Sequence, residues 1–118
     1  MNVLEIATSQ FKQKLAGELQ FISVYEWKDS KGEPVKIYYK PSMTFKQLQK
    51  VMRATNNGNQ SEAIIQTLII RALDEDGKPL FRQNDMTQLM NETDPEVINK
   101  IVIALNEKDE SIEEIKKN

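Results

Sequence analysis

Two stretches in the first third of the chain alternate apolar and polar side chains, which is the pattern of a half-buried strand. The first covers residues 19–27 and places Phe21 and Trp27 on one aromatic-rich face. The second covers residues 35–40 and separates the two faces more cleanly. Residues 28–34 between them include Gly and Pro, so the sequence predicts a β-hairpin. Because a lone hairpin is marginally stable in water, we expect it to pack on helices or on another subunit.

Apolar residues at helical spacing mark most of the remaining chain. The segment after Ser61 is apolar on most of its sides, which is typical of the central helix of a domain. Thr44 and Gln47 match the capping box that begins a helix, and Asp85 is placed to cap a short one. The predicted helices run from Thr8 or Ser9 to Leu15, with Gly17 ending the helix, and then over residues 45–54, 61–73, 86–90 and 95–105.

These elements predict an α+β fold that is helix-dominant, with an N-terminal β-hairpin packed on a bundle of four to five short helices. The length fits a single domain over residues 1–118. We expect residues 1–8 and 107–118 to be flexible ends, with a last, fraying helical turn at Ser111.

The composition removes much of the usual enzyme chemistry. The chain has no Cys, which excludes disulfides and thiolate sites, and no His, the commonest general base and metal ligand. Chemistry that uses only carboxylates, lysine or Mg²⁺ is still possible on these grounds. No run approaches the roughly 18 apolar residues of a membrane span. We therefore expect no enzyme activity, no cofactor and no membrane contact.

One partial metal motif remains. Asp74, Asp76 and Gly77 match the middle of a calcium loop, in which alternate carboxylates surround the ion. The register puts Ala72 and Gln83 where the loop needs its first acidic ligand and its bidentate Glu. The sequence therefore favours an acidic turn that ends a helix, with Gly77 at a positive φ. A divalent-metal hydrolase that uses Asp74, Asp76 and Asp85 is kept as a third hypothesis to test.

Charge is unevenly distributed along the chain. Residues 1–60 carry nine Lys/Arg and five Asp/Glu, a balance of +4, whereas residues 61–118 carry seven and thirteen, a balance of −6. This is either scatter on a solvated surface or the sign of a molecule with unlike ends that stacks head to tail. The basic, aromatic-containing first half also suggests an alternative function as a small nucleic-acid-binding regulator. Against that alternative, the whole chain is acidic, and the lysines of its first half are singly spaced.

Five aromatic or apolar residues are candidates for protein interaction. Leu80 and Phe81 follow a proline in a loop between two helices, where they either anchor the loop to the core or meet a partner. Tyr38 and Tyr39 raise the same question on the hairpin, and Trp27 joins them as a large aromatic residue on the first strand.

The stretch from Ile69 to Phe81 reads as an apolar helix, then Asp-Glu-Asp-Gly, then Pro-Leu-Phe. Asp85 then opens a short helix, and Pro95 begins another. In order and spacing, this pattern resembles tail assembly chaperones of long-tailed bacteriophages. The preceding hairpin is similar to the front half of such proteins, so the resemblance spans roughly residues 20–106.

The resemblance implies a largely helical protein without catalysis, so no residue inherits a catalytic role. Family members bind the long, aggregation-prone tape measure protein, help to recruit tail tube subunits around it, and tend to self-associate. The resemblance also implies a location in the cytoplasm of the bacterial host and absence from the mature virion. Many members have a second, longer form made by ribosomal frameshifting, and the final Lys-Lys-Asn is compatible with a slippery codon run.

Overall fold

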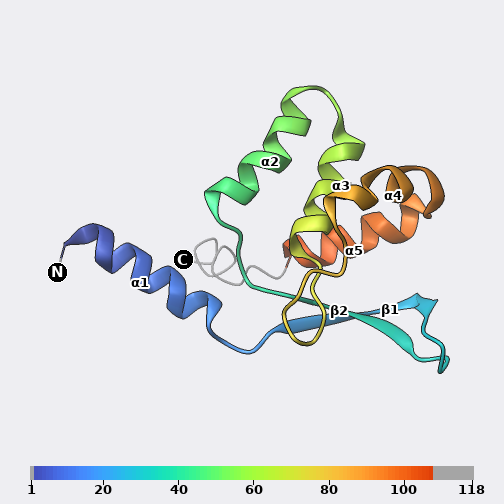
Figure 1. Ribbon diagram of the computed structural model, residues 1–118, viewed down its shortest axis with the longest axis horizontal. Helices are drawn as coiled ribbons and strands as arrows, with labels where there is room; N and C mark the ends of the chain where they lie inside the picture. Colours follow the sequence, from blue (N-terminus) through green and yellow to red (C-terminus); the bar gives the residue numbers. More distant parts are fainter. Residues whose placement is uncertain (1, 108–118) are drawn as a thin grey trace.

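The computed structural model describes residues 2–107 (Figure 1). In chain order the elements are α1 (Val3–Leu15), β1 (Gln20–Lys28), β2 (Pro34–Tyr39), α2 (Phe45–Asn56), α3 (Gln60–Arg71), the short 3-10 helix η1 (Gln83–Asp85), α4 (Met86–Glu92) and α5 (Pro95–Glu107). This order confirms the predicted α+β, helix-dominant class with a hairpin before most of the helices. The predicted turn at Ser111 and nearly all of the predicted C-terminal flexible end lie outside the described residues.

The third helix, α3, lies at the centre, because it packs against α2, α4 and α5. Its start is capped by Asn59, whose side-chain oxygen accepts the backbone N–H of Glu62 at 3.0 Å. From α3, Leu68 is fully buried in the core. The predicted apolar stripe of α5 is also confirmed as buried: Val97, Ile98, Ile101, Val102 and Leu105.

The hairpin covers one end of these helices (Figure 1). Its antiparallel register pairs Gln20 with Tyr39 and Val24 with Val35. In β2 the predicted alternation is confirmed, since Ile37 and Tyr39 are buried whereas Lys36 is exposed. The burial of an alternating set against helices is what makes this two-stranded sheet stable.

The predicted common face of Phe21 and Trp27 is wrong. The pairing slips between Val24 and Lys28, where four steps along β1 correspond to one step along β2. Such a bulge re-aims the side chains that follow it. Phe21 therefore stays on the outer face, and Trp27 packs against the core.

Residues 72–80 lie beside β2, where Leu73 forms isolated β-bridges with Tyr38 and with Pro79. Leu73 donates its N–H to the carbonyl of Tyr38 at 2.8 Å and accepts the N–H of Tyr38 at 2.9 Å. The helix predicted to reach residue 73 therefore ends at Arg71, because Leu73 is used for a β-bridge. These bonds cover part of the free edge of β2, which would otherwise be open to pairing with another chain.

The first helix corrects two predictions. It begins at Val3, well before Thr8 or Ser9, because the Asn2 side chain accepts the N–H of Glu5 at 2.8 Å. Residues 3–8, expected to be a loose lead-in, are helical. No residue of α1 is buried, and Figure 1 shows the helix projecting to the side of the other helices. The projection fits the radius of gyration, 15.7 Å, because a compact chain of this length has about 13–14 Å.

The beginning of α4 differs in detail from the prediction. Asp85 does precede the helix, but its carboxylate does not cap it. It turns back instead, and accepts the N–H of Arg82 at 2.8 Å within η1. Within residues 2–107, no helix is long and apolar enough to cross a membrane.

Candidate interaction surface

The predicted pair Leu80 and Phe81 is divided between solvent and core. The backbone N–H of Leu80 donates to the carbonyl of Ala72 at 3.0 Å, which fixes the loop against the end of α3. The Leu80 residue remains 38% exposed, whereas Phe81 is half-buried and packs against the core. Phe81 therefore anchors the loop, and Leu80 is the member of the pair that is accessible to a partner.

The two predicted hairpin tyrosines have different environments. Tyr39 is only 1% exposed, so its ring is part of this chain's own core and presents no surface to a partner. The guanidinium of Arg71 lies over that ring, 5.8 Å from its centroid, and donates to the carbonyl of Lys40 at 2.8 Å. Tyr38 is half-buried and pairs with Phe21, with 5.4 Å between ring centroids.

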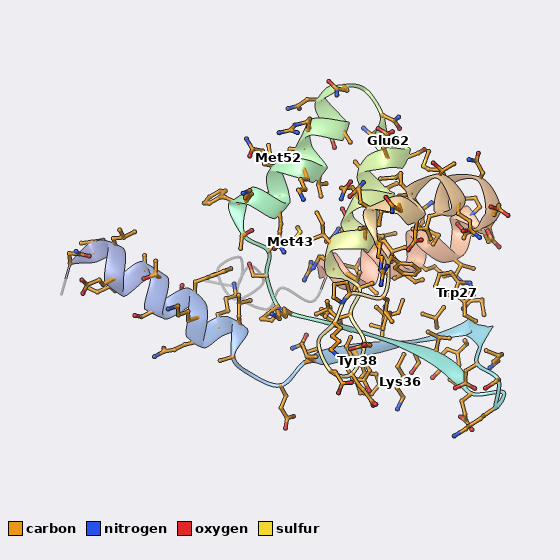
Figure 2. The ribbon with its side chains drawn as sticks, in the orientation of Figure 1. Trp27, Lys36, Tyr38, Met43, Met52 and Glu62 are labelled. Carbon is orange, nitrogen blue, oxygen red and sulfur yellow. The ribbon has the colours of Figure 1, made fainter. Side chains whose placement is uncertain are left out.

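The outer face of the hairpin combines aromatic and cationic side chains. Figure 2 shows Lys36 and Tyr38 on the side of the hairpin opposite to Trp27 and the helices. The Lys36 ammonium lies 4.9 Å from the centroid of the Phe21 ring, and Lys28 lies 5.8 Å from that of Tyr25. These are cation–π distances, so the lysines stack on exposed aromatic rings and keep their charges at the surface.

Trp27 has a structural role at the other side of the hairpin. It packs partly buried against the core, next to Glu26, whose carboxylate accepts a hydrogen bond from Lys100 of α5 at 2.9 Å. That hydrogen bond lowers the pKa of Glu26 and raises the pKa of Lys100. The ion pair joins β1 to α5. An interaction role for Trp27 stays a prediction.

An exposed apolar surface that was not among the predicted site residues lies on α2. The capping box that begins this helix is confirmed: Thr44 accepts the N–H of Gln47 at 3.1 Å, and the Gln47 side chain accepts the N–H of Thr44 at 2.9 Å. Phe45, directly after the cap, is 90% exposed, and Met52 is 51% exposed. Both belong to the apolar stripe that the sequence predicted for this helix, but α2 has no buried residue.

These side chains line an open groove. Figure 2 places Met52 on α2, the helix that packs against α3. The groove is formed by α2 and the residue that ends it: Phe45, Lys46, Leu48, Gln49, Met52, Arg53, Asn56 and Asn57. Helical periodicity identified the stripe, but it does not report which side of a stripe another element covers.

The first helix carries a second exposed apolar set. Val3, Leu4 and Ile6 are each more than half exposed. The sequence prediction missed this set, because it treated these residues as an unstructured lead-in. The Asn2 side chain, three residues before Glu5, was the available signal for the true helix start.

The acidic turn is organised by hydrogen bonds to its own backbone. One carboxylate oxygen of Asp74 accepts the N–H groups of Asp76 and Lys78, both at 2.9 Å, and Gly77 adopts φ +82°. The predicted positive φ of Gly77 is confirmed, but the turn does not end the helix: α3 ends at Arg71, and the turn joins the β-bridged residues Leu73 and Pro79. Across residues 2–107, no three acidic side chains gather in a group that would hold a metal ion, and Asp85 bonds within its own turn.

No known protein-family profile and no curated protein sequence matches this chain. Among solved structures, the chain is similar to the tail assembly chaperone of bacteriophage HK97, with a TM-score of 0.58 and 17% sequence identity. The superposition covers 90% of this chain and 98% of the phage protein. At this identity the likeness shows the fold: the chain folds as a bacteriophage tail assembly chaperone does. The order of motifs along residues 20–106 resembles the same kind of protein, a tail assembly chaperone.

Proposed function

We propose that this chain is a non-catalytic tail assembly chaperone of a long-tailed bacteriophage. It binds the tape measure protein in the cytoplasm of the bacterial host and helps to recruit tail tube subunits around it. It self-associates, and it is absent from the mature virion. The observation that carries this proposal is the fold likeness to the phage HK97 chaperone over nearly the whole of both chains.

The exposed apolar side chains support a binding role. Phe45 and Met52 on α2, and Val3 and Leu4 on α1, expose apolar surface on two helices that contribute nothing to the buried core. Contiguous apolar surface of this kind marks sites that meet another macromolecule. An aggregation-prone, elongated client needs such a surface from its chaperone, and it needs no reactive group.

Co-expression tests the proposal directly. The gene next to the one for this chain is expected to be very long and to encode a helical client; a fragment of that client is expressed alone, with this chain, and with an unrelated small soluble protein. We expect the fragment to stay soluble and to co-purify only with this chain. Precipitation of the fragment to the same extent in all three cases contradicts the proposal.

A second candidate, a nucleic-acid-binding regulator, is supported by the outer face of the hairpin. Lys36 on Phe21 and Lys28 on Tyr25 combine charge with exposed rings, as single-strand-binding surfaces do. Binding through such a face weakens steeply with salt. A mobility-shift assay with single- and double-stranded probes at low salt decides it, since no shift with either probe removes this candidate.

A further inference from the structure

The α2 helix carries an apolar stripe and a row of cations, and most of these side chains are exposed. Phe45, Leu48 and Met52 follow the helical spacing of one face and line the open groove. Lys46 and Arg53 line the same groove, and Lys50 lies one turn of the helix beyond Lys46 and lines a second hollow together with Arg53. Phe45, Met52 and the three cations are exposed, whereas Leu48 is half-buried. The result is an apolar strip with cations along one side.

The charge of α2 itself is of one sign, and the nearest carboxylate along the chain is Glu62 of α3, which lines the hollow beside Lys50 and Arg53. Between residues 34 and 61 the chain has no Asp or Glu, and its five cations are Lys36, Lys40, Lys46, Lys50 and Arg53. The three cations of α2 form no ion pair with any carboxylate of residues 2–107. A partner that covers the apolar strip must therefore approach these cations, and carboxylates beside its own apolar stripe would attract them.

We propose that α2 is the docking surface for an acidic amphipathic helix of the client. This inference rests on the proposed chaperone function and assigns it to a surface. The partner helix presents apolar residues at i, i+3 and i+7 to Phe45, Leu48 and Met52, and Asp or Glu on the flank that faces Lys46, Lys50 and Arg53. The apolar strip supplies affinity, and the cations select a partner of negative charge and fix its orientation.

Two synthetic peptides test the charge selection on the full chain. Each is an amphipathic helix of about 20 residues with the same leucine stripe, flanked by Glu in one peptide and by Lys in the other. By fluorescence anisotropy we expect the Glu peptide to bind roughly tenfold more tightly at low salt, and the difference to shrink as salt screens the charges. Equal binding of both peptides overturns the inference.

Variants of α2 locate the binding. Phe45→Ser with Met52→Ser should weaken the Glu peptide about tenfold or more, because two exposed apolar contacts are lost. Reversal of the flank by K46E, K50E and R53E should invert the preference toward the Lys peptide. Because these side chains are exposed, the variants should unfold at nearly the same temperature as wild type. Thermal unfolding followed by circular dichroism checks this.

A matched control reverses three cations elsewhere. Lys12→Glu, Lys14→Glu and Lys31→Glu change the net charge by the same amount as the α2 reversal, but leave the groove intact. We expect this variant to keep the preference for the Glu peptide. If it loses the preference as fully as the α2 variant, overall charge selects the peptide, and the docking surface on α2 is wrong.

Other occupants of α2 give their own results. A shortened chain that ends at Glu107 tests whether residues 108–118 occupy α2. If the shortened chain binds the Glu peptide much more tightly than the full chain does, that segment is the occupant. Dissociation of an oligomer by Phe45→Ser with Met52→Ser, seen in sedimentation, identifies a second copy. Either result overturns the client helix as the partner.

The client fragment separates this inference from the proposed function. If the α2 variants keep the tape measure fragment soluble as well as wild type does, the chaperone function stands and α2 is not its docking surface. If wild type fails to keep the fragment soluble but selects the Glu peptide through α2, the chaperone function fails while the assigned surface stands.

Discussion

At the scale of single residues, the same six-residue turn occurs twice. Residues 29–34 and 74–79 both read Asp-x-x-Gly-x-Pro. In each turn the Asp side chain accepts two backbone N–H groups, from the residues two and four positions later. In each, the glycine N–H donates to the Asp carbonyl at 3.0 Å. One turn joins the two strands, and the other brings the chain back from the central helix beside β2.

The glycine of the second turn gives a stability prediction. Gly77 has φ +82°, where a Cβ is strained, although the nearest atom to that Cβ is Leu19 Cδ1 at an ordinary 3.7 Å. Gly77→Ala should therefore destabilise the fold by about 1–2 kcal/mol through backbone conformation alone. The control is Gly17→Ala, since Gly17 lacks a positive φ and a Cβ there meets nothing within 4 Å. Urea unfolding measures both, and equal stabilities for the two variants contradict the prediction.

The ion pair between Glu26 and Lys100 gives a titration prediction. The hydrogen bond from Lys100 lowers the pKa of Glu26, so Lys100→Met should raise the pKa of Glu26 toward its ordinary value. A lowered carboxyl pKa stabilises the fold above the unfolded-state pKa, and this contribution is lost as pH falls through the folded-state pKa. Both side chains are exposed, so solvent screening keeps the contribution to stability small.

Carbon-detected NMR titration of the Glu26 carboxyl measures this shift in wild type and in the variant. An unchanged pKa of Glu26 in Lys100→Met means that the ion pair is not populated in solution.

At the scale of elements, α1 is the one helix whose removal should leave the fold intact. It has 13 residues and buries none of them. Because an isolated helix of that length is marginal in water, α1 adds little to the stability of the rest. Deletion of residues 1–16 should change the free energy of unfolding by less than about 1 kcal/mol. A loss of cooperative unfolding in this variant contradicts the structural assignment of α1 as an uncovered arm.

The elements that could be predicted from the sequence were those in which one face is buried, because a buried face produces a regular spacing of apolar residues. The alternation of Ile37 and Tyr39 with Lys36 and the stripe of α5 are each set by one buried face, and both were predicted from the sequence. Trp27 was misplaced because a bulge changes the face without any signal in an alternating pattern. The α2 stripe was found, but not its exposure, since periodicity marks an apolar face without showing what covers it.

The candidate site was less predictable than the fold for the same reason. Of the five predicted interaction residues, Tyr39 belongs to the core and Phe81 anchors a loop, because large aromatic side chains gain most free energy from burial. Leu80 is accessible, and Tyr38 is half-buried beside Phe21. The exposed residues Phe45 and Met52 belong to the helix predicted over residues 45–54, but they were not among the predicted interaction residues. Only the arrangement of the elements in space distinguishes these cases.

At the scale of the whole molecule, stability is concentrated around α3 and α5. The buried side chains of these helices, with those of β2, form most of the core, whereas α1 and α2 contribute no buried residue. Local opening costs little free energy where few apolar contacts are lost. Amide exchange should therefore be fastest in the helices without buried residues and slowest in the helices of the core. We expect amides in α1 to exchange at least about a thousandfold faster than those in α3, since opening α3 requires unfolding of the core.

Hydrogen exchange followed by mass spectrometry measures this gradient, and it also reports on binding. The proposed docking surface predicts that the Glu peptide slows exchange in α2, because a covered helix opens less often, while α3 and α5 hardly change. Phe45→Ser with Met52→Ser should remove the effect at α2 and leave the exchange gradient of the free protein unchanged.

Exchange in α1 that is as slow as exchange in α3 contradicts the concentration of stability in the core. Protection that appears on α1 or the hairpin instead of α2 moves the binding surface to that element.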